Sequence, residues 1–203
     1  MTAARAVVAV VLAGGQARRM GGGDKALLLL RQRPLLAHVL DAIRPQVRAV
    51  ALNANGDPDR FHHWHVPVLA DPVAGQPGPL AGILAGLGWA RALQPPAELL
   101  LSVPGDTPLL PPDLVARLMQ ARAASGAAIA CAASAGRRHP VVALWPVALH
   151  DALARALAGG ARSVGGFAAG HGVGVAVFAD RPADPFLNIN TPADLADATR
   201  LLG

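Results

Sequence analysis

The 203-residue sequence contains one cysteine, Cys131, no tyrosine and only 3% aromatic residues. A single cysteine excludes an internal disulfide and is typical of a reducing compartment, and scarce aromatic side chains leave little surface for stacking nucleic-acid bases. Hydrophobic residues make up 53% of the chain. Even so, no apolar run reaches the ~18 residues of a membrane span, and no signal peptide with a cleavage site is evident. We therefore expect a cytoplasmic protein that binds neither a membrane nor nucleic acid.

Lysine is almost missing as well, because 17 of the 18 basic residues are arginines and Lys25 is the one exception. The arginines are spread from Arg5 to Arg200, so the net charge of +5 favours small anionic ligands over a nucleic-acid lattice. An ammonium is a compact, mobile point charge that can follow phosphate oxygens, whereas guanidinium is a planar fork. The retained lysine therefore indicates a phosphate-binding role.

Lys25 ends the stretch around which the chain is organised. Residues 7–12 form an apolar, largely β-branched run, and residues 13–25 follow as a loop with five glycines. This pattern predicts a buried strand that leads into an anion-binding loop. The loop is not a P-loop, because Ala26 stands after Lys25 where that motif needs Ser or Thr, and no G-x-G-x-x-G fingerprint fits residues 13–25.

Strand and helix patterns alternate up to residue 125, which predicts a mostly parallel sheet covered on both faces, with an antiparallel strand in the C-terminal part. We predict a single three-layer α/β domain over residues 1–203, a twisted sheet flanked by helices. Strands are expected at 7–12, 47–52, 66–70, 98–103, 127–133, 139–145 and 173–178. Helices are expected at 34–45, 57–64, 80–93, 113–123, 146–157, 162–169 and 191–203.

The first expected strand leads into the glycine-rich loop, and the next three lead into polar side chains: Asn53 and Asn55, Asp71, and Asp106. Open α/β sheets bind their ligands at the carboxyl ends of such strands. A second N-x-N pair, Asn188 and Asn190, precedes the last helix, and residues two apart in a strand face the same side. This pair either contacts a ligand or a metal-bound water, or satisfies backbone groups in a turn.

These motifs, in this order, resemble those of the molybdenum cofactor guanylyltransferases. They are Leu12-Ala13-Gly14-Gly15 with Lys25, Asn53, Asp71, P-G-P-L-A-G at 77–82, G-D-T-P at 105–108, H-P at 139–140 and N-x-N-T-P at 188–192. The resemblance covers essentially the whole chain. It implies a Rossmann-like nucleotidyltransferase architecture of the glycosyltransferase-A type, with a nucleotide-binding part at about 1–110 and a cofactor-substrate part at about 111–203.

The activity implied by the resemblance is transfer of GMP from GTP to the terminal phosphate of molybdopterin, with release of pyrophosphate and with Mg²⁺ as cofactor. GTP and molybdopterin are then the partners, together with transient contact to cofactor-inserting proteins or apo-molybdoenzymes. The motif L-A-G-G instead of L-A-A-G favours guanylyl over cytidylyl transfer. The alternatives are a cytidylyl or sugar nucleotidyltransferase on the same scaffold, or a non-catalytic carrier of nucleotide or pterin.

The resemblance places the nucleotide on seven residues: Leu12, Ala13, Gly14, Lys25, Asn53, Asp71 and Asp106. Asp106 is also the expected Mg²⁺ ligand, and Arg19, Lys25 and Asp106 are the expected catalytic residues. Backbone N–H groups near Gly14 would cradle phosphate, while Arg19 and Lys25 would hold the leaving pyrophosphate. The attacking phosphate is already anionic, so the reaction needs alignment and charge neutralisation and no strong general base.

Several assignments have two readings. Asp71 either accepts the N1–H and amino group of guanine or caps the loop before the Pro-Gly segment. His139 either meets a phosphate on the pterin side, together with Asn188 and Asn190, or is a structural histidine at the start of a strand. The cluster at residues 62–65 is expected to be a hydrated helix surface, although three histidines also suggest a metal site.

Overall fold

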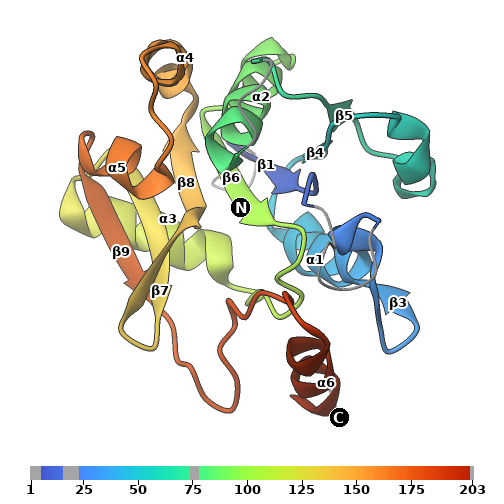
Figure 1. Ribbon diagram of the computed structural model, residues 1–203. Helices are drawn as coiled ribbons and strands as arrows, with labels where there is room; N and C mark the ends of the chain where they lie inside the picture. The colour runs from blue at the N-terminus through green and yellow to red at the C-terminus, as the bar shows by residue number, and fades with distance from the viewer. Residues whose placement is uncertain (1–5, 16–22, 74–77, 202–203) are drawn as a thin grey trace.

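Seven strands form one sheet in the part of the chain that the structure, a computed structural model, describes: residues 6–15, 23–73 and 78–201 (Figure 1). Across the sheet the order is β5 (Val68–Leu69), β4 (Val50–Asn53), β1 (Val7–Leu12), β6 (Leu99–Pro104), β8 (Arg137–Pro146), β7 (Ile129–Ser134) and β9 (Val173–Val177). The first four strands run parallel, β8 runs antiparallel to both its neighbours, and β9 pairs in parallel with β7. The predicted mostly parallel sheet with an antiparallel strand is confirmed.

Helices cover both faces of this sheet. α1 (Leu35–Ile43) and α3 (Leu114–Ser125) share one core with alternate β1 residues such as Val7 and Val11. α2 (Pro79–Ala92), α4 (His150–Ala158) and α5 (Val164–Ala169) share the other with Val8 and Val10. Successive strand side chains point to opposite faces, and all of residues 7–11 are fully buried, which explains the unbroken apolar run. The predicted three-layer domain is confirmed; its division near residue 110 stays a prediction.

Some short elements differ from the predictions. The segment expected as an α-helix at 57–64 is a 3₁₀ helix, η4 (Pro58–Trp64), and the segment 146–157 is divided into η5 (Val147–Leu149) and α4. Two further 3₁₀ turns are η2 (Lys25–Leu27) and η3 (Arg44–Gln46). β2 (Leu29–Leu30) and β3 (Arg33–Pro34) form a hairpin that the sequence does not predict. Its turn residues, Arg31 and Gln32, have φ angles of 50° and 63°, and without Asn or Gly there the usual hairpin signal is missing.

The C-terminal helix, α6 (Pro192–Leu201), begins as the sequence predicts. The N–H of Asp194 donates to Oγ1 of Thr191 over 3.2 Å, and the carboxylate of Asp194 accepts from the N–H groups of Asn190 and Thr191, each over 2.8 Å. The N–H of Asn190, foremost among these donors, lowers the pKa of Asp194 from its ordinary value. Because Ile189 and Ala198 are buried in one small core, this helix fixes the segment that carries the second N-x-N pair.

Two glycines let α2 approach the sheet closely. A Cβ at residue 86 would lie 2.8 Å from Cγ1 of Val10, closer than real Cβ contacts come. A Cβ at residue 82 would overlap Oδ1 of Asn53 and lie 2.7 Å from Cδ2 of Leu12. The beginning of α2 is thereby held against the carboxyl ends of β1 and β4.

Candidate active site

A cavity of about 470 Å³ lies beyond the carboxyl ends of β1, β4 and β6. β1 pairs with β4 on one side and with β6 on the other, and the chain crosses from one side to the other between β5 and β6, which is the kind of switch point at which open α/β sheets bind ligands. The cavity is lined by Leu12, Ala13, Gly14, Gly15, Lys25, Ala26, Asn53, Asn55, Asp71, Gly78, Pro79, Pro104, Gly105, Asp106, Val141 and Asn188.

All seven residues expected to bind nucleotide line this cavity, although they come from segments up to 94 residues apart, 12 to 106. Asn188 lines it as well, from the C-terminal part of the chain. Arg19 lies outside the described residues. The roles assigned to the individual residues stay predictions.

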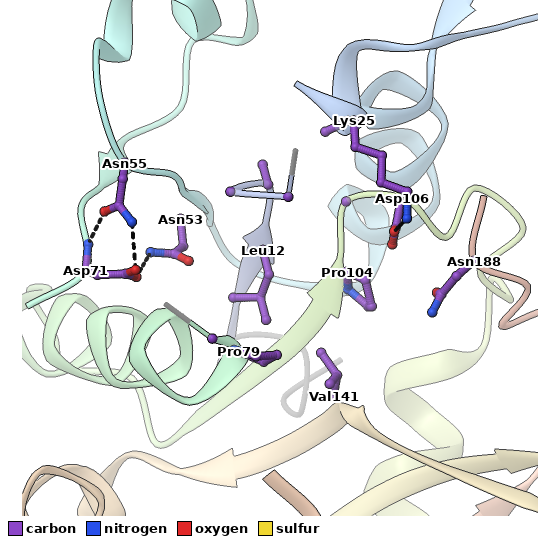
Figure 2. Close-up of a pocket in the computed structure, with 16 residues that line it drawn as sticks. Leu12, Lys25, Asn53, Asn55, Asp71, Pro79, Pro104, Asp106, Val141 and Asn188 are labelled. Carbon is purple, nitrogen blue, oxygen red and sulfur yellow. Dashed lines mark hydrogen bonds and ion pairs between the residues drawn. The ribbon is translucent and has the colours of Figure 1, made fainter. Parts of the chain in front are cut away.

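One end of the cavity is an amide corner, formed by Asn53, Asn55 and Asp71 (Figure 2). The two oxygens of the Asp71 carboxylate accept hydrogen bonds from Nδ2 of Asn53 over 2.9 Å and from Nδ2 of Asn55 over 2.7 Å. The N–H of Asp71 in turn donates to Oδ1 of Asn55 over 2.8 Å. The carboxylate is therefore held in one orientation by two amides from the end of β4.

Asn55 lines the cavity, although the sequence analysis placed it only at a strand end and did not include it among the nucleotide-binding residues. Its signal was present, because Asn53 and Asn55 are two of only four asparagines in the chain and stand two residues apart at a strand end. What the sequence could not supply was the partner, since the contact with Asp71 spans 16 residues.

The other end is a lysine corner, formed by Lys25, Asp106 and Asn190. The N–H of Lys25 donates to the carbonyl of Gly15 over 3.0 Å, which closes the glycine-rich loop. Its ammonium contacts Oδ2 of Asp106 and Oδ1 of Asn190. The side chains of Lys25 and Asp106 are 12% and 19% exposed, so this ion pair is largely shielded from water. Figure 2 shows Leu12 between the two corners.

The second N-x-N pair packs directly on the loop that carries Asp106. Oγ1 of Thr107 donates to Oδ1 of Asn188 over 2.6 Å, and the N–H of Ile189 donates to the carbonyl of Asp106 over 3.0 Å. Asn188 therefore lines the cavity while its side chain is engaged by a threonine hydroxyl, and its role toward a ligand stays a prediction.

His139 does not line the cavity; it belongs to a polar network at the β7–β8 hairpin. Its Nε2 lies 2.8 Å from Oγ of Ser134, whose hydroxyl donates to Asp184 over 2.7 Å. Since that hydroxyl proton is used, Nε2 of the neutral ring is the donor. Burial lowers the pKa of His139, against the opposing effect of Asp184, and Arg137 lowers it further. These contacts are those of a structural histidine, and a role toward pterin stays a prediction.

The side chains that line the cavity include two carboxylates that could bind a metal ion, those of Asp71 and Asp106. Within the described ranges, no group of three or more His, Cys, Asp and Glu side chains could hold a metal. The ring centroids of His62 and His63 lie 3.7 Å apart, with the ring planes tilted by 40°. Mg²⁺ needs few protein ligands, because it keeps water and binds substrate phosphates. Asp106 fits this pattern, since it offers one carboxylate to the cavity; a cation there would displace the ammonium of Lys25 from it. Among the helices of the same ranges, none is long and apolar enough to cross a bilayer.

A lysine facing a carboxylate and a second polar corner at the same sheet edge are what a nucleotidyltransferase site requires, and the comparisons with known proteins place the chain in that class. The family described as "MobA-like NTP transferase domain" matches residues 9–172. A molybdenum cofactor guanylyltransferase of Rhodopseudomonas palustris is 56% identical over 97% of this chain and 94% of its own. The chain belongs to the MobA-like NTP transferase family and, within it, groups with the molybdenum cofactor guanylyltransferases. The resemblance to molybdenum cofactor guanylyltransferases that the sequence motifs indicated is confirmed.

Two solved structures show the same fold. A molybdopterin-guanine dinucleotide biosynthesis protein A from Archaeoglobus fulgidus has a TM-score of 0.73 and 23% identity, covering 97% of this chain and 98% of its own. A protein of Mycobacterium tuberculosis, crystallised in complex with manganese, has a TM-score of 0.65 and 19% identity, covering 96% and 98%. These likenesses confirm the architecture expected from the resemblance.

Proposed function

We propose that this protein transfers GMP from GTP to the terminal phosphate of molybdopterin. An oxygen of that phosphate attacks the α-phosphorus of GTP, the bond from the α-phosphorus to the bridging oxygen breaks, and pyrophosphate leaves. The observation that carries the proposal is the cavity at the switch point, where an amide corner and a lysine corner stand at opposite ends. A nucleoside triphosphate has the same division into a hydrogen-bonding base and a polyanion.

The amide corner suits guanine. Guanine presents N1–H and an exocyclic amine as adjacent donors, and a carboxylate can accept about four hydrogen bonds in all. Asp71 accepts one from each of two asparagines, so it has capacity left for both donors of the base. Adenine offers an acceptor at N1 and would leave part of this capacity unused. Asp71 is therefore assigned to guanine recognition.

The lysine corner suits the phosphates and a divalent cation. Backbone N–H groups near Gly14 and the ammonium of Lys25 would neutralise the triphosphate, with Arg19 on the leaving pyrophosphate. Asp106 would hold Mg²⁺, which supplies charge neutralisation and a template for in-line transfer. The manganese complex of a protein with this fold supports a divalent cation here.

The acceptor side is assigned to the part of the cavity beside β8. Val141 and Asn188 line it there, and Asn190 reaches the ammonium of Lys25 from the same segment. We assign Val141, Asn188 and Asn190 to molybdopterin; His139, which does not line the cavity, is left out of this assignment. The attacking phosphate brings its own negative charge, so alignment by these residues is the main requirement.

Pyrophosphate release tests the proposal. The purified protein is incubated with molybdopterin, Mg²⁺ and either GTP, CTP or ATP, and the dinucleotide product is identified by mass spectrometry. Release with GTP, and much less with CTP or ATP, is the expected result. Pyrophosphate release with CTP, or with a sugar phosphate in place of molybdopterin, would instead identify a different transferase. Binding of nucleotide without pyrophosphate release would identify a carrier.

A further inference from the structure

Arg60 connects the two ends of the site without lining the cavity. It lies in η4, directly after the loop that follows Asn55. Its Nη2 donates to the carbonyl of Asn55 over 2.6 Å, and its Nη1 donates to the carbonyl of Asp57. Its Nε lies 2.6 Å from Oδ2 of Asp24. Within the described residues that nitrogen has no aligned hydrogen-bond partner, so its contact with Asp24 is one of charge.

Each partner of Arg60 stands next to one corner. Asn55 holds the Asp71 carboxylate through its side chain, while its carbonyl is held by Arg60. Asp24 immediately precedes Lys25 in the glycine-rich loop. The side chains of Arg60 and Asp24 are 25% and 21% exposed, which is shielded enough for a planar guanidinium to hold a fixed geometry.

We propose that Arg60 is a positioning residue that sets the separation between the amide corner and the lysine corner. The inference rests on the proposed function, because only a ligand that occupies both corners depends on their separation. GTP would span both. Guanosine would use the amide corner alone, and inorganic tripolyphosphate would use the lysine corner alone.

A distinctive pattern of binding follows. Without the Arg60 side chain, each corner keeps the side chains that bind its ligand, so guanosine and tripolyphosphate, the two fragments of GTP, keep their affinities. GTP loses affinity, because its base and its phosphates no longer find both corners at the matching distance. A residue that served folding alone would affect all three ligands alike, and a residue that touched phosphate would affect tripolyphosphate.

The test compares Arg60→Met with Arg44→Met. Arg44 is a matched control, because its Nη2 also donates to a main-chain carbonyl, that of Trp64 at the end of η4, over 2.8 Å. Dissociation constants for GTP, guanosine and tripolyphosphate are measured with Mg²⁺ by calorimetry or by competition. For Arg60→Met we expect GTP to bind about tenfold more weakly, or about 1.4 kcal/mol, with both fragments within about twofold. Arg44→Met should leave all three unchanged.

Equal losses for all three ligands, a loss for tripolyphosphate, or unchanged GTP binding would each overturn the inference. Asp24→Asn serves as a second variant in case Arg60→Met folds poorly. It should reproduce the GTP-specific loss, and the double variant should lose no more than either single one, because the two residues act through one contact. If the unaltered protein does not prefer GTP to CTP, the proposed function fails, independently of what Arg60 does.

Discussion

Replacing Lys25 by methionine is expected to slow guanylyl transfer and, at the same time, to tighten the binding of a divalent cation by the nucleotide-free protein. Methionine keeps much of the length of the side chain and removes its charge. The ammonium of Lys25 lies against the Asp106 carboxylate, which is the proposed ligand of the cation. We therefore expect the lysine to compete for Asp106 when nucleotide is absent and to neutralise phosphate when it is present.

The two magnitudes can be worked out separately. Two unit charges about 4 Å apart interact by about 4 kcal/mol at an effective dielectric constant of 20 and by about 1 kcal/mol in water. Since the side chains are 12% and 19% exposed and the ammonium is partly replaced by solvent, we take about 1.4 kcal/mol, or about tenfold in the cation's dissociation constant. Loss of one preorganised charge should lower turnover by about 10²-fold.

Titration of the nucleotide-free protein with Mn²⁺, followed by electron paramagnetic resonance, measures the first effect, and pyrophosphate release measures the second. Arg44→Met removes the same charge elsewhere and controls for net charge, while Asp106→Asn should abolish the tight Mn²⁺ site. Weaker or unchanged Mn²⁺ binding by Lys25→Met would refute the competition between lysine and cation. Near-normal turnover would refute the place of Lys25 at the phosphates.

Three further predictions concern other parts of the molecule. Asp71→Asn should lose most of the preference for GTP over ATP, measured as the ratio of kcat/KM values, and an unchanged ratio would reject guanine recognition by Asp71. Gly82→Ala should lower the free energy of unfolding by about 1–3 kcal/mol, the usual cost of overpacking, because the added Cβ would overlap Asn53. The same overlap should weaken GTP binding. Urea denaturation measures the first effect and calorimetry the second. Burial lowers the pKa of His139 below its ordinary value of 6.5, so the unfolded chain binds more protons there and stability should fall as the pH drops below about 6.5. The urea midpoint of His139→Gln should lack this part of the pH dependence, and an identical profile would contradict it.

The sequence predicted the buried strands well, because a strand covered on both faces must be apolar at every position. Val7 to Val11 show this, with alternate side chains in two separate cores. The β2–β3 hairpin escaped prediction since its turn is built from Arg31 and Gln32 at positive φ. Nothing in those two residue types indicates such a backbone; the surrounding structure imposes it.

The candidate site could be predicted as a set of residues, because parallel strands bring their carboxyl ends to one edge. Its internal pairing could not. The contact between Lys25 and Asn190 spans 165 residues, and the bridge from Asp24 to Arg60 depends on where η4 packs. Such contacts follow from the tertiary structure and leave no local pattern in the sequence.

His139 and Lys25, both expected from the sequence to bind a ligand, have different surroundings in the structure. Both were selected from the sequence as charged or titratable residues near a motif. The ring of His139 is engaged by Ser134 and packs 4.9 Å from the ring of Phe186, and replacing these neighbours with a ligand would dismantle a turn. The partners of Lys25 are oxygen atoms that border an open cavity. In the proposed reaction a cation would take over Asp106 while phosphate takes over the ammonium, so every charge would stay neutralised; the surroundings of His139 offer no such exchange.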